Sequence, residues 1–135
     1  MVNSVGVDMV QISEMKRLID ISGDVFIKRT FSKAEVERSK RAANRAEFFA
    51  TRFAAKEATF KAVAHFTKNK GFDLRIIETL EEPDGYPVIR VNNKLGALLE
   101  EAGISALHIS LTHDGDYAMA FVVAERCCEK VEETS

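Results

Sequence analysis

Alternating apolar and polar positions mark the start of the chain as a strand. In SVGVDMVQI, residues 4–12, the apolar residues Val5, Val7 and Met9 are separated by single residues of other kinds, one of which is Asp8. Successive side chains of a strand point to opposite faces, so this period of two predicts a strand. Asp8 then lies on the face opposite Val7 and Met9, either toward solvent or, as a buried carboxylate, in need of a partner.

Helix end signals follow this strand. A short helix is predicted over residues 13–21, capped by Ser13. Ser32 and Glu35 have the spacing of a capping box, which predicts that another helix opens there. A polar, basic stretch then continues as far as Asn44.

A longer helix is predicted over residues 45–65, because this segment contains RFAAKEATFKA and has neither Gly nor Pro. TKNKG, residues 67–71, ends it. A further helix is predicted over residues 94–102. It closes at Gly103, since glycine readily adopts the left-handed conformation of a helix C-cap.

The remaining segments read as two pairs of strands. The turn EPDGYP joins the first pair, and Asp114-Gly115, a strong hairpin signal, joins the second. The four strands are predicted over residues 72–80, 88–92, 106–113 and 116–125. This order of elements predicts an α+β fold in which an antiparallel sheet packs on a long central helix.

Length and composition place few further limits on the fold. A chain of 135 residues fits one domain, 1–135, with residues 126–135 as a frayed acidic tail. No apolar run reaches the ~20 residues that cross a bilayer, and the first residues do not resemble a signal peptide. Cys127 and Cys128 are adjacent, which suits neither a structural disulfide nor a metal site, so we expect a cytoplasmic location.

The net charge of −2 conceals a segregation of charge along the chain. Residues 28–61 hold ten Lys or Arg and four Glu, a net charge of +6, which leaves 9 basic and 17 acidic residues, a net charge of −8, elsewhere. A basic stretch in an acidic protein indicates an anionic partner, such as a phosphorylated ligand, a nucleic acid or an acidic protein. The alternative is a solvated helix face.

Two candidate charged residues stand on the apolar long helix. Glu57 and Lys61 are four residues apart, the spacing of a common surface ion pair. Together with Asp8 they could instead form a magnesium-phosphate site, since Mg²⁺ binds through one or two carboxylates and a lysine can neutralise phosphoryl charge. Lys56 points about 100 degrees away from Glu57 on a helix, so we expect it to be solvated.

The strand HISLTH carries the other candidates. His108, Ser110 and Thr112 share one face, and His113 lies on the other, at the end of the hairpin. A histidine at a strand end can be structural or catalytic. The chain has no nucleophile elbow, Walker loop, dinucleotide fingerprint or HExxH motif, which removes most familiar enzyme classes.

Three segments together resemble the holo-acyl-carrier-protein synthases, a group of 4'-phosphopantetheinyl transferases. They are GVDMVQI, FIKRTFSKAE followed by FFATRFAAKEATFKA, and HISLTHDGDYAMAFVVAE, and DGYPVI resembles the family's G-x-P turn. The resemblance spans about residues 5–125. It implies transfer of phosphopantetheine from coenzyme A to a serine of an acidic apo acyl carrier protein, with release of adenosine 3',5'-bisphosphate.

The resemblance also implies roles for individual residues. Asp8 and Glu57 would hold Mg²⁺, and Lys61 would contact the phosphates. The base that takes the serine proton is left open between Glu57, acting through a water, and a water on the metal. The residues expected beside the coenzyme are Arg52, Gly85, Tyr86, Pro87 and His113, and we expect Arg45 to help Arg52 neutralise its 3'-phosphate.

The family implies homotrimers with active sites shared between subunits, and no nucleic-acid or membrane partner. Two alternatives are a non-catalytic relative that binds coenzyme A or a carrier, and a nucleic-acid-binding protein. The second requires exposed aromatic residues among the cations, whereas Phe48, Phe49 and Phe53 recur at core spacing.

The chain departs from the family pattern at three places. Glu14 and Val25 replace basic residues in the region that the family uses to dock the carrier, and residues 63–66 replace a glycine-rich loop. These departures leave open which carrier, of fatty-acid synthesis or of a specialised pathway, is served.

Overall fold

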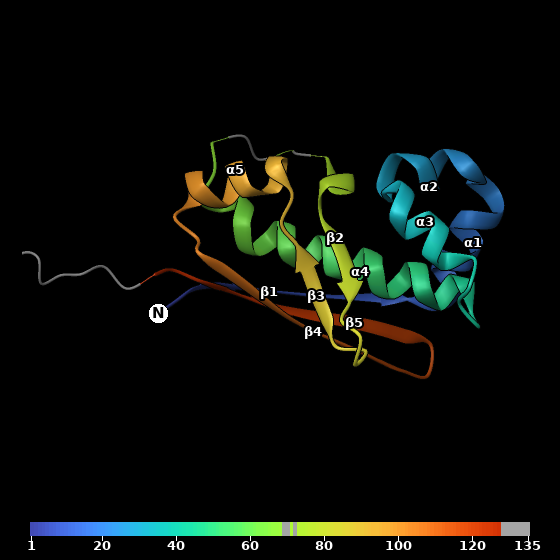
Figure 1. Ribbon diagram of the computed structural model, residues 1–135. Helices are drawn as coiled ribbons and strands as arrows, with labels where there is room; N and C mark the ends of the chain where they lie inside the picture. The colour runs from blue at the N-terminus through green and yellow to red at the C-terminus, as the bar shows by residue number, and fades with distance from the viewer. Residues whose placement is uncertain (69–70, 72, 128–135) are drawn as a thin grey trace, which may run out of the picture.

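The computed structural model describes residues 1–68, 71 and 73–127 (Figure 1). Their helices and strands, in chain order, are β1 (Val2–Gln11), α1 (Ile12–Ser22), α2 (Asp24–Thr30), α3 (Lys33–Ser39), α4 (Arg45–Ala64), the 3₁₀ helix η1 (Leu74–Ile76), β2 (Glu78–Glu81), β3 (Pro87–Arg90), α5 (Asn93–Ala102), β4 (Ala106–Asp114) and β5 (Tyr117–Glu125). The predicted α+β class with an antiparallel sheet is confirmed.

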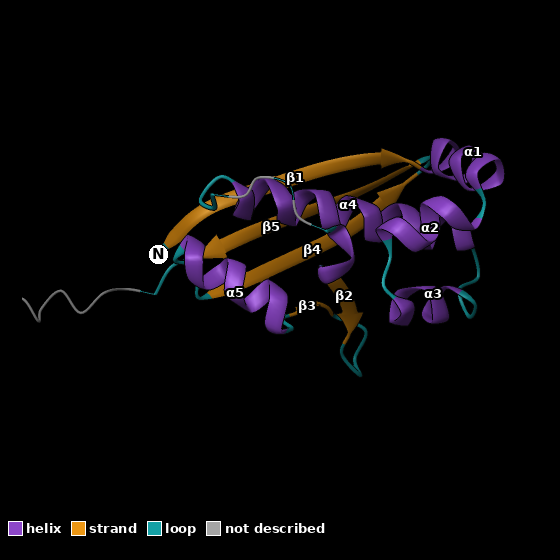
Figure 2. Ribbon diagram, turned by 90° about the horizontal axis from the view of Figure 1, so that it is seen from above, coloured by secondary structure: helices purple, strands orange, loops and turns teal. Residues whose placement is uncertain are grey.

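A three-stranded sheet in the order β1-β5-β4 forms the base of the molecule. Both neighbouring pairs are antiparallel, and Asp8 of β1 and Leu111 of β4 flank the same residue of β5, Ala120. β1 and β4 are therefore opposite edges of this sheet. β2 and β3 form a separate antiparallel pair that crosses beside it (Figure 2).

α4 packs very closely on the sheet because the facing residues are small. Ala54, Ala55, Ala58 and Ala62 of α4 have no exposed surface, nor have Ala118, Ala120 and Ala124 of β5. A Cβ atom added to Gly6 of β1 would lie 1.9 Å from the carbonyl oxygen of Ala58. Ser4, on the same face of β1, donates a hydrogen bond of 2.6 Å to the carbonyl oxygen of Ala62. Glycine is thus required where β1 crosses α4.

Among the described residues, no helix covers the opposite face of the sheet (Figure 1). Apolar side chains of β1 and β5 lie exposed on it, and we call this surface the outer face. Its large exposed members are Val5, Val7, Met9, Tyr117 and Phe121. Val7 and Phe121, which are directly paired, are 49% and 44% exposed, so this is a continuous apolar surface and not a set of scattered residues.

Several sequence-based predictions are confirmed. The helix predicted over 45–65 is α4, and the helix predicted over 94–102 is α5, which ends at Gly103 in the left-handed conformation. Ser32 and Glu35 form the predicted capping box of α3. The predicted hairpin at Asp114-Gly115 is formed by β4 and β5.

Other predictions need correction. Ser13 does not cap α1, because the helix begins one residue earlier and the Ser13 hydroxyl donates to Asp116 at 2.6 Å. α2 was not predicted, since it is only seven residues long and follows α1 after Gly23 alone. Residue 72 of the strand predicted over 72–80 lies outside the described residues, and the rest of that segment contains η1 and most of β2.

Most of the predicted frayed tail, residues 128–135, lies outside the described residues, as do residues 69–70 of the predicted helix break. In the part of the chain that the structure describes, no helix is long and apolar enough to cross a membrane.

We predict that Gly6→Ala lowers the free energy of unfolding by about 2–3 kcal/mol, because the added methyl meets backbone atoms that cannot rotate away. Urea denaturation checks this. Gly96→Ala in α5 is the control: its Cβ would meet only a side-chain atom at 3.6 Å, and helix propensity favours alanine. Equal stability of Gly6→Ala and the wild type would refute the close contact.

Candidate functional site

Asp8, Glu57 and Lys61 come together where β1 crosses α4. The ammonium group of Lys61 lies 3.2 Å from the Asp8 carboxylate and also donates to the carbonyl oxygen of Val7 at 3.1 Å. The Asp8 side chain is 19% exposed and that of Lys61 51%. Asp8 does lie opposite Val7, as predicted, but it occupies the packed face of β1 while Val7 is exposed.

Glu57 is held in an unfavourable electrostatic position. Burial raises the pKa of the Glu57 carboxyl, and the nearby Asp8 carboxylate raises it further, while Lys61 acts in the opposite direction. The two carboxylates repel each other, and a divalent cation bound between them would reduce this repulsion.

The donor set fits Mg²⁺ better than a softer metal. Within the described residues, no group of three or more His, Cys, Asp or Glu could hold a metal ion. Zinc sites need at least three protein ligands, whereas Mg²⁺ is held by one or two carboxylates and keeps waters or substrate phosphates. Asp8 and Glu57 are the two residues that would hold it.

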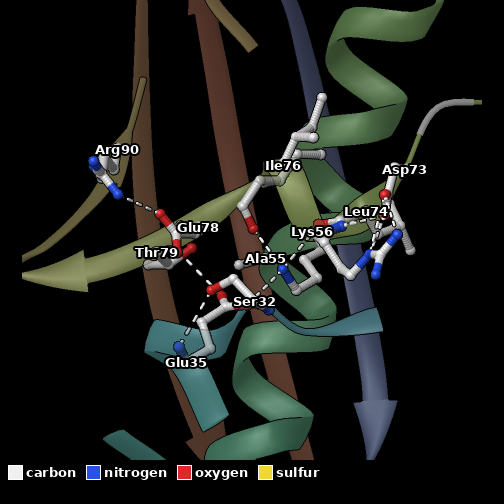
Figure 3. Close-up of polar contacts among 12 residues, drawn as sticks. Ser32, Glu35, Ala55, Lys56, Asp73, Leu74, Ile76, Glu78, Thr79 and Arg90 are labelled. Carbon is white, nitrogen blue, oxygen red and sulfur yellow. Dashed lines mark hydrogen bonds and ion pairs between the residues drawn. The ribbon is translucent and has the colours of Figure 1, made fainter. Parts of the chain in front are cut away.

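Lys56 is not solvated, contrary to the sequence-based expectation. Its side chain has no exposed surface, and its ammonium group lies 2.7 Å from the carboxylate of Glu35, which is 1% exposed (Figure 3). The ammonium group also donates to the carbonyl oxygens of Leu74 and Ile77. Burial lowers the pKa of Lys56, and Glu35 opposes this effect. The helix face that we expected to meet solvent is covered by α3, η1 and β2.

A groove of about 450 Å³ lies on another side of the molecule. It is lined by residues of α3, α4, β4, the loop after α3 and the β2–β3 hairpin, among them Arg38, Arg41, Arg52, Gly85, Pro87 and His113. His113 contacts Glu47 at 3.1 Å between Nε2 and Oε2. Arg52 and Arg38 both reach the Glu81 carboxylate, at 3.4 and 3.0 Å. Three guanidinium groups thus surround an open groove, a setting that favours a phosphorylated ligand.

The structure divides the predicted site residues into two groups. Arg52, Gly85, Pro87 and His113 line the groove, whereas Asp8, Glu57 and Lys61 do not. Tyr86 is 62% exposed and lies outside the lining of this groove. Arg45 lines a neighbouring groove and stacks on the ring of Phe49 at 4.9 Å.

Some lining residues were missed by sequence reasoning. Arg38 and Arg41 belong to the basic segment whose charge excess was noted, but nothing in the sequence shows which of its cations face the groove. Glu47 and Glu81 carried no signal at all. They join the groove through contacts with His113, Arg38 and Arg52, which are distant from them in sequence or on other elements.

Known proteins that resemble this chain belong to the family indicated by its sequence motifs. The family model of the 4'-phosphopantetheinyl transferase superfamily matches residues 4–122. Holo-[acyl-carrier-protein] synthase of Clostridium kluyveri is 36% identical over 134 residues, which cover 99% of this chain and 96% of the relative. That of Halothermothrix orenii is 33% identical over 125 residues, covering 93% and 98%.

Solved structures agree. The holo-[acyl-carrier-protein] synthase of Neisseria meningitidis matches with a TM-score of 0.84 at 32% identity, covering 93% of this chain and 100% of the other. The Helicobacter pylori enzyme, solved in complex with coenzyme A, matches with a TM-score of 0.75 at 25% identity, covering 90% and 99%.

The chain therefore belongs to the 4'-phosphopantetheinyl transferase superfamily. Within this superfamily it is an enzyme of the holo-[acyl-carrier-protein] synthase family, which confirms the resemblance drawn from the sequence.

We predict that Glu57→Gln stabilises the metal-free protein at neutral pH by on the order of 0.5 kcal/mol, after allowance for solvent screening. The pKa of Glu57 is raised on folding, so the ionised carboxyl destabilises the fold above that pKa, and the penalty disappears as the pH falls through it. Urea denaturation at several pH values in chelator checks this. If the variant is less stable than the wild type at pH 7, the ionised Glu57 carboxyl does not destabilise the fold.

Proposed function

We propose that this chain transfers the 4'-phosphopantetheine group of coenzyme A to a serine of an apo acyl carrier protein, and that the reaction needs Mg²⁺ and releases adenosine 3',5'-bisphosphate. The juxtaposition of Asp8, Glu57 and Lys61 carries this proposal, because it unites a pair of carboxylates and a lysine from two separate elements. Membership of the family supplies the reaction class.

Each site residue then has a defined task. Asp8 and Glu57 hold the metal, which when bound neutralises the charge of the diphosphate. Lys61, half exposed beside them, turns toward the phosphates and neutralises charge on the leaving group. The serine oxygen attacks the phosphorus that carries pantetheine, the bond to adenosine 3',5'-bisphosphate breaks, and the serine proton is lost to a base.

The groove suits the nucleotide part of coenzyme A. Arg38, Arg41 and Arg52 line it, where a phosphate would compete with the Glu81 carboxylate for Arg38 and Arg52, and the hairpin residues Gly85 and Pro87 form a wall beside His113. We infer that His113 contacts the coenzyme and that Tyr86, exposed on the same turn, covers the adenine. Electrostatic attraction between the basic segment and an acidic carrier would chiefly raise the association rate.

We further propose a homotrimer in which each active site is shared between two subunits. Asp8, Glu57 and Lys61 do not line the groove, and Asp8 and His113 lie on opposite edge strands of one sheet, about 10 Å apart across the sheet. The groove of one subunit beside the metal residues of the next would complete one site. The exposed apolar outer face offers the surface for this association.

Phe121→Glu should dissociate the assembly, because it places a charge at the centre of the outer face. Analytical ultracentrifugation should then give a monomer, and transfer activity should fall by at least about 100-fold with the loss of a completed site. Val91→Glu is the matched control, since Val91 is also an exposed apolar residue but lies between β3 and α5, outside the three-stranded sheet. If the Phe121→Glu variant is a monomer with full activity, the proposal of a shared active site is wrong.

The decisive experiment is to incubate the protein with Mg²⁺, coenzyme A and apo acyl carrier protein and to weigh the intact carrier. The carrier should gain one phosphopantetheine, and chelator should prevent the gain. Glu57→Gln and Lys61→Ala should each lower turnover by about 100-fold or more.

The alternative function is that of a non-catalytic relative that binds coenzyme A or a carrier. Binding of coenzyme A without any gain in carrier mass, with each of the source organism's carriers, would establish that alternative. Phe48 and Phe49 are buried, so they are not available to stack on nucleic-acid bases. We also infer a cytoplasmic location, because the two adjacent cysteines cannot staple the fold in an oxidising compartment.

A further inference from the structure

The buried ion pair between Lys56 and Glu35 is hydrogen-bonded to several segments of the chain. Besides the Glu35 carboxylate at 2.7 Å, the Lys56 ammonium group donates to the carbonyl oxygens of Leu74, at 2.9 Å, and Ile77. All three of its N–H donors are used, and neither side chain is more than 1% exposed. The ammonium group therefore fixes the chain on both sides of η1.

Glu35 extends the same network to two further elements (Figure 3). One of its oxygens accepts from the backbone N–H of Ser32 at 3.0 Å, which closes the capping box of α3. The other accepts from the backbone N–H of Thr79 in β2 at 3.5 Å. The pair thus joins the first turn of α3, the middle of α4 and the start of β2.

These three elements continue directly into the walls of the groove. α3 leads to Arg38 and then to Arg41, and β2 leads through Glu81 to the turn with Gly85 and Pro87. Arg52, one turn before Lys56 on α4, reaches Glu81, so both cations tie the same helix face to β2.

An ion pair of this kind makes contacts that apolar side chains at the same positions could not make. Replacing a buried pair by apolar side chains is often neutral or stabilising. Apolar side chains at positions 35 and 56 could fill the space but could not bind the carbonyl oxygens of Leu74 and Ile77 or the Thr79 N–H. The pair therefore fixes the positions of α3, α4 and β2 relative to one another.

We propose that Lys56 and Glu35 are positioning residues that set the width of the groove and thereby its affinity for the nucleotide of coenzyme A. This inference rests on the proposed function. Lys56 stands next to Glu57 in sequence but faces β2, whereas Glu57 faces β1. One side of α4 therefore places Glu57 and Lys61 beside Asp8, and another side lines the proposed nucleotide groove.

The test compares two affinities in the same variants. Calorimetry gives the Kd of adenosine 3',5'-bisphosphate, and electron paramagnetic resonance gives the Kd of Mn²⁺ without nucleotide. The variants are Lys56→Met/Glu35→Leu, which removes the pair without leaving a lone buried charge, and Glu35→Asp, which keeps the negative charge but shortens the side chain, so that its contacts with Ser32, Lys56 and Thr79 cannot all be kept. Lys16→Met/Asp20→Leu removes an exposed ion pair of α1 in the same way and is the control.

We expect the double variant at positions 35 and 56 to weaken nucleotide binding by about tenfold or more, as a misplacement of binding groups does, while Mn²⁺ affinity and the control stay within about twofold of the wild type. Glu35→Asp should weaken nucleotide binding less, by about threefold, and it covers the case in which the double variant does not fold, because it leaves Lys56 with a carboxylate partner. Wild-type nucleotide affinity in either folded variant, or equal losses of both affinities, would overturn the inference.

The wild type separates this inference from the proposed function. A wild-type protein that does not bind adenosine 3',5'-bisphosphate removes the proposed function and the inference together. A wild type that binds it, beside variants that bind it equally well, overturns the inference alone.

Discussion

The close packing of α4 on β1 is the contact on which the candidate site depends. At Gly6 the strand approaches the helix backbone so closely that no side chain fits, and Ser4 donates to the carbonyl oxygen of Ala62 nearby. Two residues beyond Gly6, on the same face, Asp8 reaches Lys61 and adds to the field at Glu57. The site therefore exists because a helix rich in alanine and a strand with a glycine can pack almost backbone to backbone.

The charged residues of α4 are explained by what each side of the helix meets. Glu57 and Lys61 face β1, where their charges remain partly open to solvent. Arg52 and Lys56 face β2, where carboxylates and backbone carbonyl oxygens surround them. A buried charge is costly unless it is paired and hydrogen-bonded, and each of the two buried cations has a carboxylate partner. A helix with apolar residues around much of its circumference can thus carry charges on two sides.

The proposed trimer explains two features of the structure. One is the exposed apolar outer face, and the other is that Asp8, Glu57 and Lys61 lie apart from the residues that line the groove. An apolar sheet face is costly to leave in water. The groove that we propose for the nucleotide is not lined by Asp8 or Glu57, which we propose hold the metal. Association of subunits through the outer face would bury the apolar surface and bring the two groups together. Stability and catalysis would then depend on the same association.

Local patterns in the sequence were sufficient for much of the fold. The capping box at Ser32, the C-cap at Gly103 and the hairpin at Asp114-Gly115 depend on neighbouring residues, so they were predicted correctly. The motifs around Asp8 and Glu57 likewise identified the family. The exposure of Lys56 was predicted wrongly. Its burial depends on Glu35 and on the chain around η1, which are far from it in sequence on either side. Only the tertiary structure could bring such segments together, since the energy of a buried charge depends on partners that no local pattern specifies.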